Sequence, residues 1–324
     1  MKKTIISIII LIVIILSVVI LSGATKKYKV DSNSNGKIQI VTTIFPLYDF
    51  IKNVGGDKVE VSMIIPSGVD VHDYEPTPQD IIKIDNADMF IYMGDDIEFW
   101  AKTLTDGVDD RDKIYSVSEN LDLIETEEFE HKHGIEEDDE HEEHHHSEKY
   151  DTHVWLDLTK AVQITENIAY ILDNYDEKNV EYYNKNKEEY VSKLLELDNE
   201  IMNTVSRSEN KKIAFGGPFA YAYFIERYGL EFISAYDSCG EGGEPSVFKI
   251  KEVIEYINEN KIPVIFYKEM SSGNIARTIA EETNAKVLEF NSIHTVTDKE
   301  LEDGVSYIKL MRKNLDNLKE SLNF

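Results

Sequence analysis

Three histidines lie where a fold could bring metal ligands together. His72 and His294 each follow a short apolar, β-branched run by a few residues, and His153 opens the motif His-Val-Trp directly after a highly charged stretch. A single histidine in a loop is usually structural. A metal site is indicated only because three histidines occupy such positions together. Neutral imidazole suits zinc and similar transition metals, and three imidazoles with one oxygen make a tetrahedral site.

Six more histidines lie in an acidic run over residues 125–150, which holds 12 acidic residues and two lysines. They are His131, His133, His141, His144, His145 and His146. We expect this run to be a loose loop that packs no core and chelates metal weakly; a solvated insert without a task is the alternative. His141-Glu142 with His145 matches a zinc-peptidase pattern, but that pattern needs a helix with an apolar face. Charged flanks make it a chance match.

Composition limits the class of ligand. Lysine and arginine number 34 against 62 acidic residues, a net charge of −28, which argues against nucleic acid and favours a cation; a merely solubilising surface is the alternative. The single cysteine, Cys239, excludes an intramolecular disulfide and a cysteine-cluster zinc site.

The N-terminus indicates export. Two lysines precede an apolar run over residues 5–21, so residues 1–24 are predicted to be a signal peptide or an N-terminal membrane anchor. Residues 25–37 are predicted to form a polar tether.

Strand and helix patterns alternate in two series, which predicts an α/β protein of two lobes, each a mostly parallel sheet flanked by helices. Predicted strands cover residues 38–44, 59–65, 89–92, 212–215, 231–234, 262–267 and 286–290. Predicted helices cover residues 47–54, 158–173, 176–205, 219–228, 246–258 and 272–283, with others after the caps Thr77 and Thr297. A single final helix is expected to carry apolar residues from Leu301 to Leu322.

The predicted domain division follows from this alternation. Residues 38–157 form an N-terminal lobe that includes the loop 125–150, residues 158–210 form linking helices, and residues 211–324 form a C-terminal lobe. The helix over residues 176–205 is long enough to join two lobes. Since parallel sheets bind ligands beyond the carboxyl ends of their strands, His72 and His294 are expected at such ends, one in each lobe.

Between residues 38 and 322 the chain resembles the solute-binding proteins of zinc and manganese ABC importers, a family that includes adhesin-like members. The segments that carry the resemblance are IVTTIFPLYDFIKNVGGDKVEV, VDVHDYEPTPQDI, THVWLDL, FIERYGL, GGEPS, SSGNIARTIAEETNAKVL and YIKLMRKNLDNLKESL. The resemblance implies two lobes joined by a long helix, one metal ion between them, and a His-rich acidic loop in the zinc-selective branch.

By the same resemblance, His72 and His153 match the family's first two metal ligands. The third falls near Pro218, which cannot bind metal, and the fourth falls near Asn291. We expect His294 to substitute in the same lobe. Water, Asn291, Asp237, Cys239 and Glu244 are candidates for the remaining position. Three histidines with this loop favour zinc over manganese.

The expected function is that of a non-enzymatic, monomeric capture protein that delivers zinc to a membrane permease and its ATPase. The alternatives are a surface adhesin with a structural metal, a manganese-binding importer component, and a zinc hydrolase. Related Gram-positive proteins usually carry a lipid-modified cysteine where this chain has Ala24. We therefore expect cell-surface tethering by residues 5–21, or release after cleavage.

Overall fold

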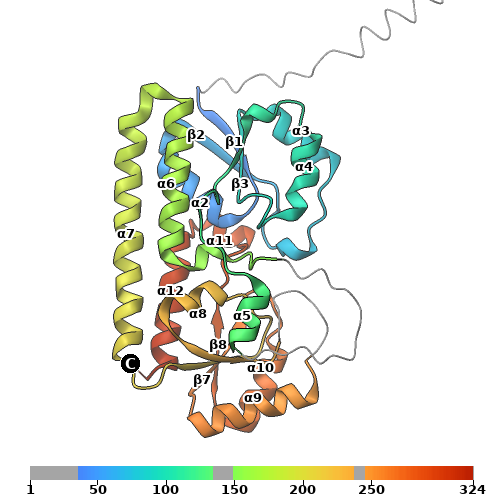
Figure 1. Ribbon diagram of the computed structural model, residues 1–324, viewed down its shortest axis with the longest axis vertical. Helices are drawn as coiled ribbons and strands as arrows, with labels where there is room; N and C mark the ends of the chain where they lie inside the picture. Colours follow the sequence, from blue (N-terminus) through green and yellow to red (C-terminus); the bar gives the residue numbers. More distant parts are fainter. Residues whose placement is uncertain (1–35, 134–148, 237–244, 324) are drawn as a thin grey trace, which may run out of the picture. The chain divides into compact units, whose positions relative to one another are not determined.

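The computed structural model describes residues 36–133, 149–236 and 245–323. Lys37–Phe324 form one compact unit, which contains two parallel four-stranded sheets and the helices that cover them (Figure 1). The predicted α/β class is therefore confirmed. Within the described ranges, no helix combines the length and apolar character that crossing a membrane requires. The predicted segment 1–24, and the tether 25–37 up to its last two residues, lie outside the described residues.

The first sheet is built from the β-branched runs of the N-terminal half. Its strand order is β2-β1-β3-β4, with every neighbouring pair parallel. The predicted capping box of Thr77 and Asp80 is present at the start of α3. The sequence interpretation missed β4, whose three residues are too short a run to stand out. The elements are β1 (Ile38–Thr42), α2 (Phe45–Gly55), η1 (Gly56–Lys58), β2 (Val59–Met63), η2 (Val71–Asp73), α3 (Pro78–Asn86), β3 (Met89–Tyr92), η3 (Phe99–Ala101), α4 (Lys102–Gly107), η4 (Arg111–Lys113) and β4 (Ile114–Ser116).

The second sheet repeats the same order of connections in the C-terminal half. Its strands are ordered β6-β5-β7-β8 and are again parallel throughout. Gly229 ends α8 in the left-handed conformation, as its position after the helical pattern predicts. The elements are β5 (Lys212–Phe215), α8 (Ala222–Tyr228), β6 (Glu231–Ser234), α9 (Val247–Asn260), β7 (Val264–Lys268), α10 (Asn274–Thr283) and β8 (Lys286–Phe290).

Two long helices stand between the sheets in sequence and pack side by side (Figure 1). They are α6 (Leu158–Tyr175) and α7 (Val180–Arg207), joined by η6 (Glu177–Asn179). Helix α7 contacts α2, beside the first sheet, and also α8 and α12 (Tyr307–Ser321), beside the second. Its 28 residues span roughly 42 Å, and its predicted apolar stripe is buried. The stripe consists of Tyr183, Tyr190, Leu194, Leu197, Ile201 and Val205.

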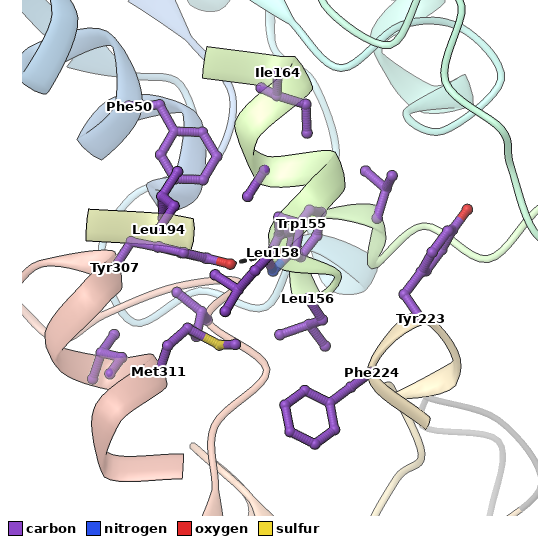
Figure 2. Close-up of a cluster of buried hydrophobic side chains, with 14 of the residues drawn as sticks. Phe50, Trp155, Leu156, Leu158, Ile164, Leu194, Tyr223, Phe224, Tyr307 and Met311 are labelled. Carbon is purple, nitrogen blue, oxygen red and sulfur yellow. Dashed lines mark hydrogen bonds between the residues drawn. The ribbon is translucent and has the colours of Figure 1, made fainter. Parts of the chain in front are cut away.

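One hydrophobic core joins elements of both sheets. Figure 2 shows Phe50 of α2, Leu194 of α7, and Tyr307 and Met311 of α12 around Trp155. All five side chains are buried. Trp155 lies in η5 (Val154–Leu156), directly after one of the three candidate histidines. The segment that carries His153 is therefore anchored in this core.

Two sequence predictions in the C-terminal half are wrong. The single final helix is divided into α11 (Asp298–Glu302) and α12, because Gly304 has a φ of 68° that a helix cannot continue through. The Thr297 capping box is present, but it begins only the short α11. A helix over residues 246–258 would place Val247 on one face with Val253 and Ile257, but the Val247 side chain is 80% exposed whereas the other two are buried.

The start of the acidic run also differs from its predicted loop character. Residues 126–133 form helix α5 (Thr126–His133), and Phe129 packs against Phe219 and Phe232 with ring centroids about 6 Å apart. Phe129 thus docks this charged segment onto the half of the molecule that contains the second sheet. Residues 134–148 lie outside the described residues.

Candidate metal site

The three candidate histidines converge. His72, His153 and His294 each offer a ring nitrogen, and these three atoms all lie within 4.8 Å of one another. The ring centroids are 4.4 Å apart for His153 and His294, 5.2 Å for His72 and His294, and 6.0 Å for His72 and His153. Residues 222 positions apart in the chain are thus neighbours because the loops of two sheets and the η5 segment meet here.

His72 is supplied by the loop that follows the edge strand β2. It lies in the one-turn helix η2 and is half-buried. Its backbone N–H donates to Asp70 Oδ1 at 3.1 Å, and Asp70 Oδ2 accepts from Lys268 Nζ at 2.7 Å. Lys268 ends β7 of the second sheet. The loop of the first sheet is therefore tied to the second by an ion pair.

The Asp70–Lys268 pair is largely enclosed. The Lys268 side chain is 5% exposed and that of Asp70 is 26% exposed. Burial by itself would raise the pKa of Asp70, but the charge and hydrogen bond of Lys268, together with the His72 N–H and ring, lower the pKa, and the net shift is downward. Asp70 is consequently ionised at neutral pH and holds both Lys268 and the His72 backbone.

His153 precedes η5 and is 1% exposed. Its backbone N–H donates to Asp151 Oδ1 at 2.8 Å, and its ring Nδ1 lies 3.1 Å from the same oxygen. A carboxylate on Nδ1 favours a proton there, which leaves Nε2 with the lone pair that a metal needs.

His294 follows the edge strand β8 and is 3% exposed. The preceding residue, Ile293, has a φ of 62°, an uncommon conformation for a branched side chain. Ring Nδ1 lies 3.4 Å from Ser292 Oγ, whereas Nε2 is buried without a hydrogen-bond partner among the described residues. Burial, followed by the effects of His153, His72 and Lys268, holds the pKa of His294 well below its usual range. The ring is therefore neutral.

Trp155 couples the segments of His153 and His294. Its ring centroid lies 5.6 Å from that of His153 and 4.9 Å from that of His294. Its indole Nε1–H donates to the Ser292 carbonyl at 2.8 Å. Tyr307 donates its hydroxyl to the Trp155 carbonyl (Figure 2). The aromatic wall thus fixes the spacing of two imidazoles.

A cavity of about 280 Å³ adjoins the cluster and is lined by His72, His294 and Trp155. Its far wall includes Trp100 and Glu98. Glu98 is 3% exposed and accepts a hydrogen bond from the Met93 N–H at 2.7 Å. Burial raises the pKa of Glu98 to about 7. The space beside the imidazoles is therefore mostly apolar, with one carboxyl group near its neutral form.

The candidates for a fourth ligand stay a prediction. Asn291 is buried, but its side-chain oxygen accepts from the Ile293 N–H at 2.7 Å, and its backbone pairs with Asn314, so it shapes the turn that carries His294. Asp237, Cys239 and Glu244 lie outside the described residues.

Of the six histidines in the acidic run, two lie within the described residues and four do not. His133 Nε2 lies 2.7 Å from Glu226 Oε1, so this ring docks α5 onto α8. His131 is exposed on α5. His141, His144, His145 and His146 lie outside the described residues, and with them the peptidase-like pattern.

Sequence reasoning missed three polar residues around the histidines: Asp70, Lys268 and Glu269. Lys268 and Glu269 come at the carboxyl end of β7, where parallel sheets place ligand-handling groups. That position was the available signal, but a Lys-Glu pair at a strand end looks like an ordinary solvated turn. Both residues are in fact buried, at 4% and 5% exposure.

Two parallel α/β sheets whose strand-end loops converge on buried imidazoles define a metal-binding protein of the solute-receptor class. Comparison with known proteins supports the same class. The family model of the periplasmic component A of zinc-uptake complexes matches residues 40–321.

Relatives of known name agree. The high-affinity zinc uptake system protein ZnuA of Bacillus subtilis is 35% identical over 300 residues, 92% of each chain. The zinc-binding lipoprotein AdcA of Streptococcus pneumoniae is 32% identical over 89% of this chain, which spans 56% of AdcA. The crystal structure of the Zn(II)-bound ZnuA-like domain of that AdcA superposes with a TM-score of 0.73 at 29% identity, covering 89% of this chain and all of the domain.

The chain belongs to the family of extracytoplasmic zinc-binding components of ABC importers. Proteins of this family bind and deliver a solute and are not enzymes.

Proposed function

We propose that this chain captures Zn²⁺ between its two sheets with His72, His153 and His294, and delivers the ion to a membrane permease driven by an ATPase. Zinc is the cargo in this proposal, so the site must both bind and release it. The observation that carries the proposal is the convergence of three ring nitrogens within 4.8 Å, from three separate segments of the chain.

The geometry needs only a small contraction to hold zinc. With zinc–nitrogen bonds of 2.0–2.1 Å in a tetrahedron, ligand nitrogens lie roughly 3.3 Å apart. Side-chain rotations and a shift of the half-buried His72 can supply the difference. The neutral state of His294 means that zinc does not have to displace a proton from that ring at neutral pH.

We propose a water molecule as the fourth ligand, because Asn291 has committed its side-chain oxygen to the Ile293 N–H. Asp237, Cys239 and Glu244 remain predicted alternatives from outside the described residues. Imidazole ligands with this coordination number favour zinc over manganese, which takes oxygen ligands in larger number.

The proposed arrangement of the whole chain keeps the predicted division. Residues 38–157 and 211–324 act as lobes, residues 158–210 link them, and residues 1–24 and 25–37 export and tether a monomer at the cell surface. The two parallel sheets and the long α7 support this division. The acidic surface, with a net charge of −28, raises the local concentration of cations.

Zinc titration calorimetry of the purified chain and its three single histidine-to-alanine variants tests the proposal. We expect one tight site in the unsubstituted chain and a lower zinc affinity of that site in each variant. Full affinity in any one of the three would remove that residue from the proposed ligand set.

The adhesin alternative makes a different prediction. A structural metal would support binding to host surfaces and leave zinc import intact when the chain is deleted. Import capacity, measured as growth at limiting zinc with and without added zinc, therefore separates delivery from adhesion.

A further inference from the structure

We propose that Glu269 and Ser292 form a hydrogen-bond relay that sets the tautomer of His294, which makes Glu269 a positioning residue of the metal site. This inference rests on the proposed role of His294 as a zinc ligand. It assigns a task to a buried carboxyl group that neither the fold nor the family resemblance accounts for.

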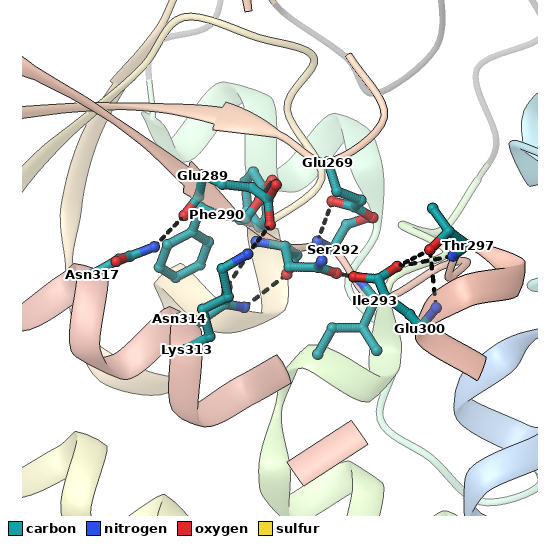
Figure 3. A network of polar contacts seen from close by, with 12 residues as sticks. Glu269, Glu289, Phe290, Ser292, Ile293, Thr297, Glu300, Lys313, Asn314 and Asn317 are labelled. Atoms are coloured by element: carbon teal, nitrogen blue, oxygen red, sulfur yellow. Dashed lines mark hydrogen bonds and ion pairs between the residues drawn. The ribbon is translucent and has the colours of Figure 1, made fainter. Parts of the chain in front are cut away.

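Both carboxylate oxygens of Glu269 accept hydrogen bonds from one residue, Ser292. The Ser292 N–H donates to Glu269 Oε2 at 2.6 Å, and the Ser292 hydroxyl donates to Glu269 Oε1 (Figure 3). Both residues are buried, with Glu269 5% and Ser292 0% exposed. The two oxygens of Glu269 are thus acceptors, and each meets a proton of Ser292.

The serine hydroxyl has only one proton, and that proton is directed to Glu269. Its oxygen can then only accept from its other neighbour, His294 Nδ1, which lies 3.4 Å away. Nδ1 must carry the proton in this arrangement, so Nε2 holds the lone pair. Nε2 is the atom that is buried without a hydrogen-bond partner among the described residues.

The 3.4 Å separation is long for a hydrogen bond in the metal-free protein. A metal ion on Nε2 withdraws electrons from the ring and makes Nδ1–H a stronger donor. Zinc binding should therefore shorten this contact, and the relay should contribute most when the ion is present.

Ser292 itself cannot easily move away from this role. Its carbonyl accepts from the Trp155 indole at 2.8 Å, and the neighbouring Asn291 is held by Asn314 on α12 (Figure 3). His153 reaches the same result by a shorter path, since Asp151 contacts its Nδ1 directly. The rings of His153 and His294 then both carry their proton on Nδ1, which leaves the Nε2 lone pair available to a metal ion.

Glu269→Gln is the most informative substitution because it can reverse the relay. The glutamine amide N–H₂ can donate to Ser292 Oγ, so the serine proton turns to His294 Nδ1, and the ring proton moves to Nε2. That proton blocks zinc. We expect zinc affinity to fall about 10- to 100-fold, as for other outer partners of metal ligands.

Two substitutions of Ser292 should lower zinc affinity less than Glu269→Gln does. Ser292→Ala removes the partner of Nδ1 without imposing the wrong tautomer, so its loss of affinity should be smaller than that of Glu269→Gln. Ser292→Thr keeps the hydroxyl and should restore affinity to within a few-fold of the unsubstituted chain. Asp49→Asn is the matched control, since Asp49 is another buried carboxylate, bound by Tyr190, and its loss should leave zinc affinity unchanged.

The tautomer itself can be read in the metal-free full-length chain by ¹⁵N NMR of the histidine rings, with His294→Gln assigning the signal. We expect protonated Nδ1 in the unsubstituted chain and protonated Nε2 in Glu269→Gln. The same tautomer in both, or a larger loss of affinity in Ser292→Ala than in Glu269→Gln, overturns the relay. If the tautomer depends on Glu269 while His294→Ala keeps full zinc affinity, the relay stands and the proposed ligand role of His294 fails.

Discussion

The segments that carry His72 and His294 differ in how firmly they are held. Each follows an edge strand, β2 in the first sheet and β8 in the second. His294 is 3% exposed, and its turn is held by Glu269, Asn314 and Trp155. His72 is half-buried, and its loop is held across the sheets by the Asp70–Lys268 pair.

This difference suggests a division of labour within one site. The buried side, His294 with His153, provides a preformed pair of imidazoles, and the His72 side can open. A cargo site needs both properties, because rigid ligands give affinity and an openable ligand gives a path for release. The first of the following predictions tests that contrast directly, and the others test the groups around it.

The largest effect is expected at the buried side. His294→Ala should lower zinc affinity by more than the roughly 100-fold upper range of outer-partner substitutions. His72→Ala should lower zinc affinity less, because solvent can replace a half-buried ligand more readily than a buried one. Calorimetric titration of both variants measures the difference. Equal losses, or a larger loss in His72→Ala, would contradict the division into a rigid and an openable side.

The ion pair that holds the His72 loop should matter next. Asp70→Asn removes the carboxylate that accepts from the buried Lys268 ammonium at 2.7 Å, so we expect the free energy of unfolding to fall by about 2 kcal/mol, below the 3–5 kcal/mol of fully enclosed pairs. Zinc should also dissociate faster, measured by stopped-flow transfer to a chelator. Glu255→Gln is the control, because the exposed Lys251–Glu255 pair should change stability by less than about 1 kcal/mol. An unchanged dissociation rate would remove the pair as a holding contact.

The same pair predicts a pH dependence. The pKa of Asp70 is lowered in the folded chain from 3.8, so its contribution to stability is present above that value and is lost as pH falls through the folded-state pKa. Urea unfolding between pH 5 and pH 3 should therefore show a smaller acid-induced loss of stability in Asp70→Asn than in the unsubstituted chain. Parallel curves for the two proteins would argue against the assignment.

Glu98 should give stability the opposite pH dependence from that given by Asp70. Burial raises its pKa from 4.5 to about 7, so the stability it contributes is complete below about pH 4.5 and is lost as pH rises through 7. Glu98→Gln should flatten the pH dependence of stability over that interval and make the variant the more stable protein at pH 8. Urea midpoints at pH 5, 6, 7 and 8 check this. A variant that is less stable at pH 8 would contradict it.

The smallest effect is expected from the His-rich run. Deleting residues 134–148, which leaves α5 in place, should change the affinity of the tight site less than about twofold and should abolish the weak zinc binding. Titration of the deletion beside the unsubstituted chain measures both. The deletion should not extend to residues before 134, because Phe129 and His133 dock α5 onto its neighbours. A large loss of tight affinity would make the run part of the site.

Local patterns predicted much of the fold. Strands such as β3 and β8 were predicted at their observed bounds, because short β-branched and apolar runs between turn residues have few other solutions. The apolar stripe of α7 and the capping box at Thr77 were equally readable, since both depend on residues three or four positions apart. Errors came where one residue outweighed its neighbours, as Phe129 does in α5 and Gly304 does between α11 and α12.

The candidate site was likewise predictable only in part. Residue type and position after a strand were sufficient to single out His72 and His294, because imidazole chemistry and the geometry of parallel sheets are general. His153 was singled out by the motif His-Val-Trp directly after the charged run. Their ligand roles stay a prediction until zinc is titrated. The distances between them could not be predicted, since they depend on how loops from two sheets and the η5 segment pack around Trp155.

The sequence alone therefore determined most of the elements, the candidate ligands and the class of cargo, all of which depend on local chemistry. Only the tertiary structure decided which polar groups stand behind the ligands. Glu269 and Ser292 are 23 residues apart and lie on different strand ends, and Lys268 meets Asp70 across 198 residues. Contacts of that range are fixed by packing of a whole core, which no local pattern encodes.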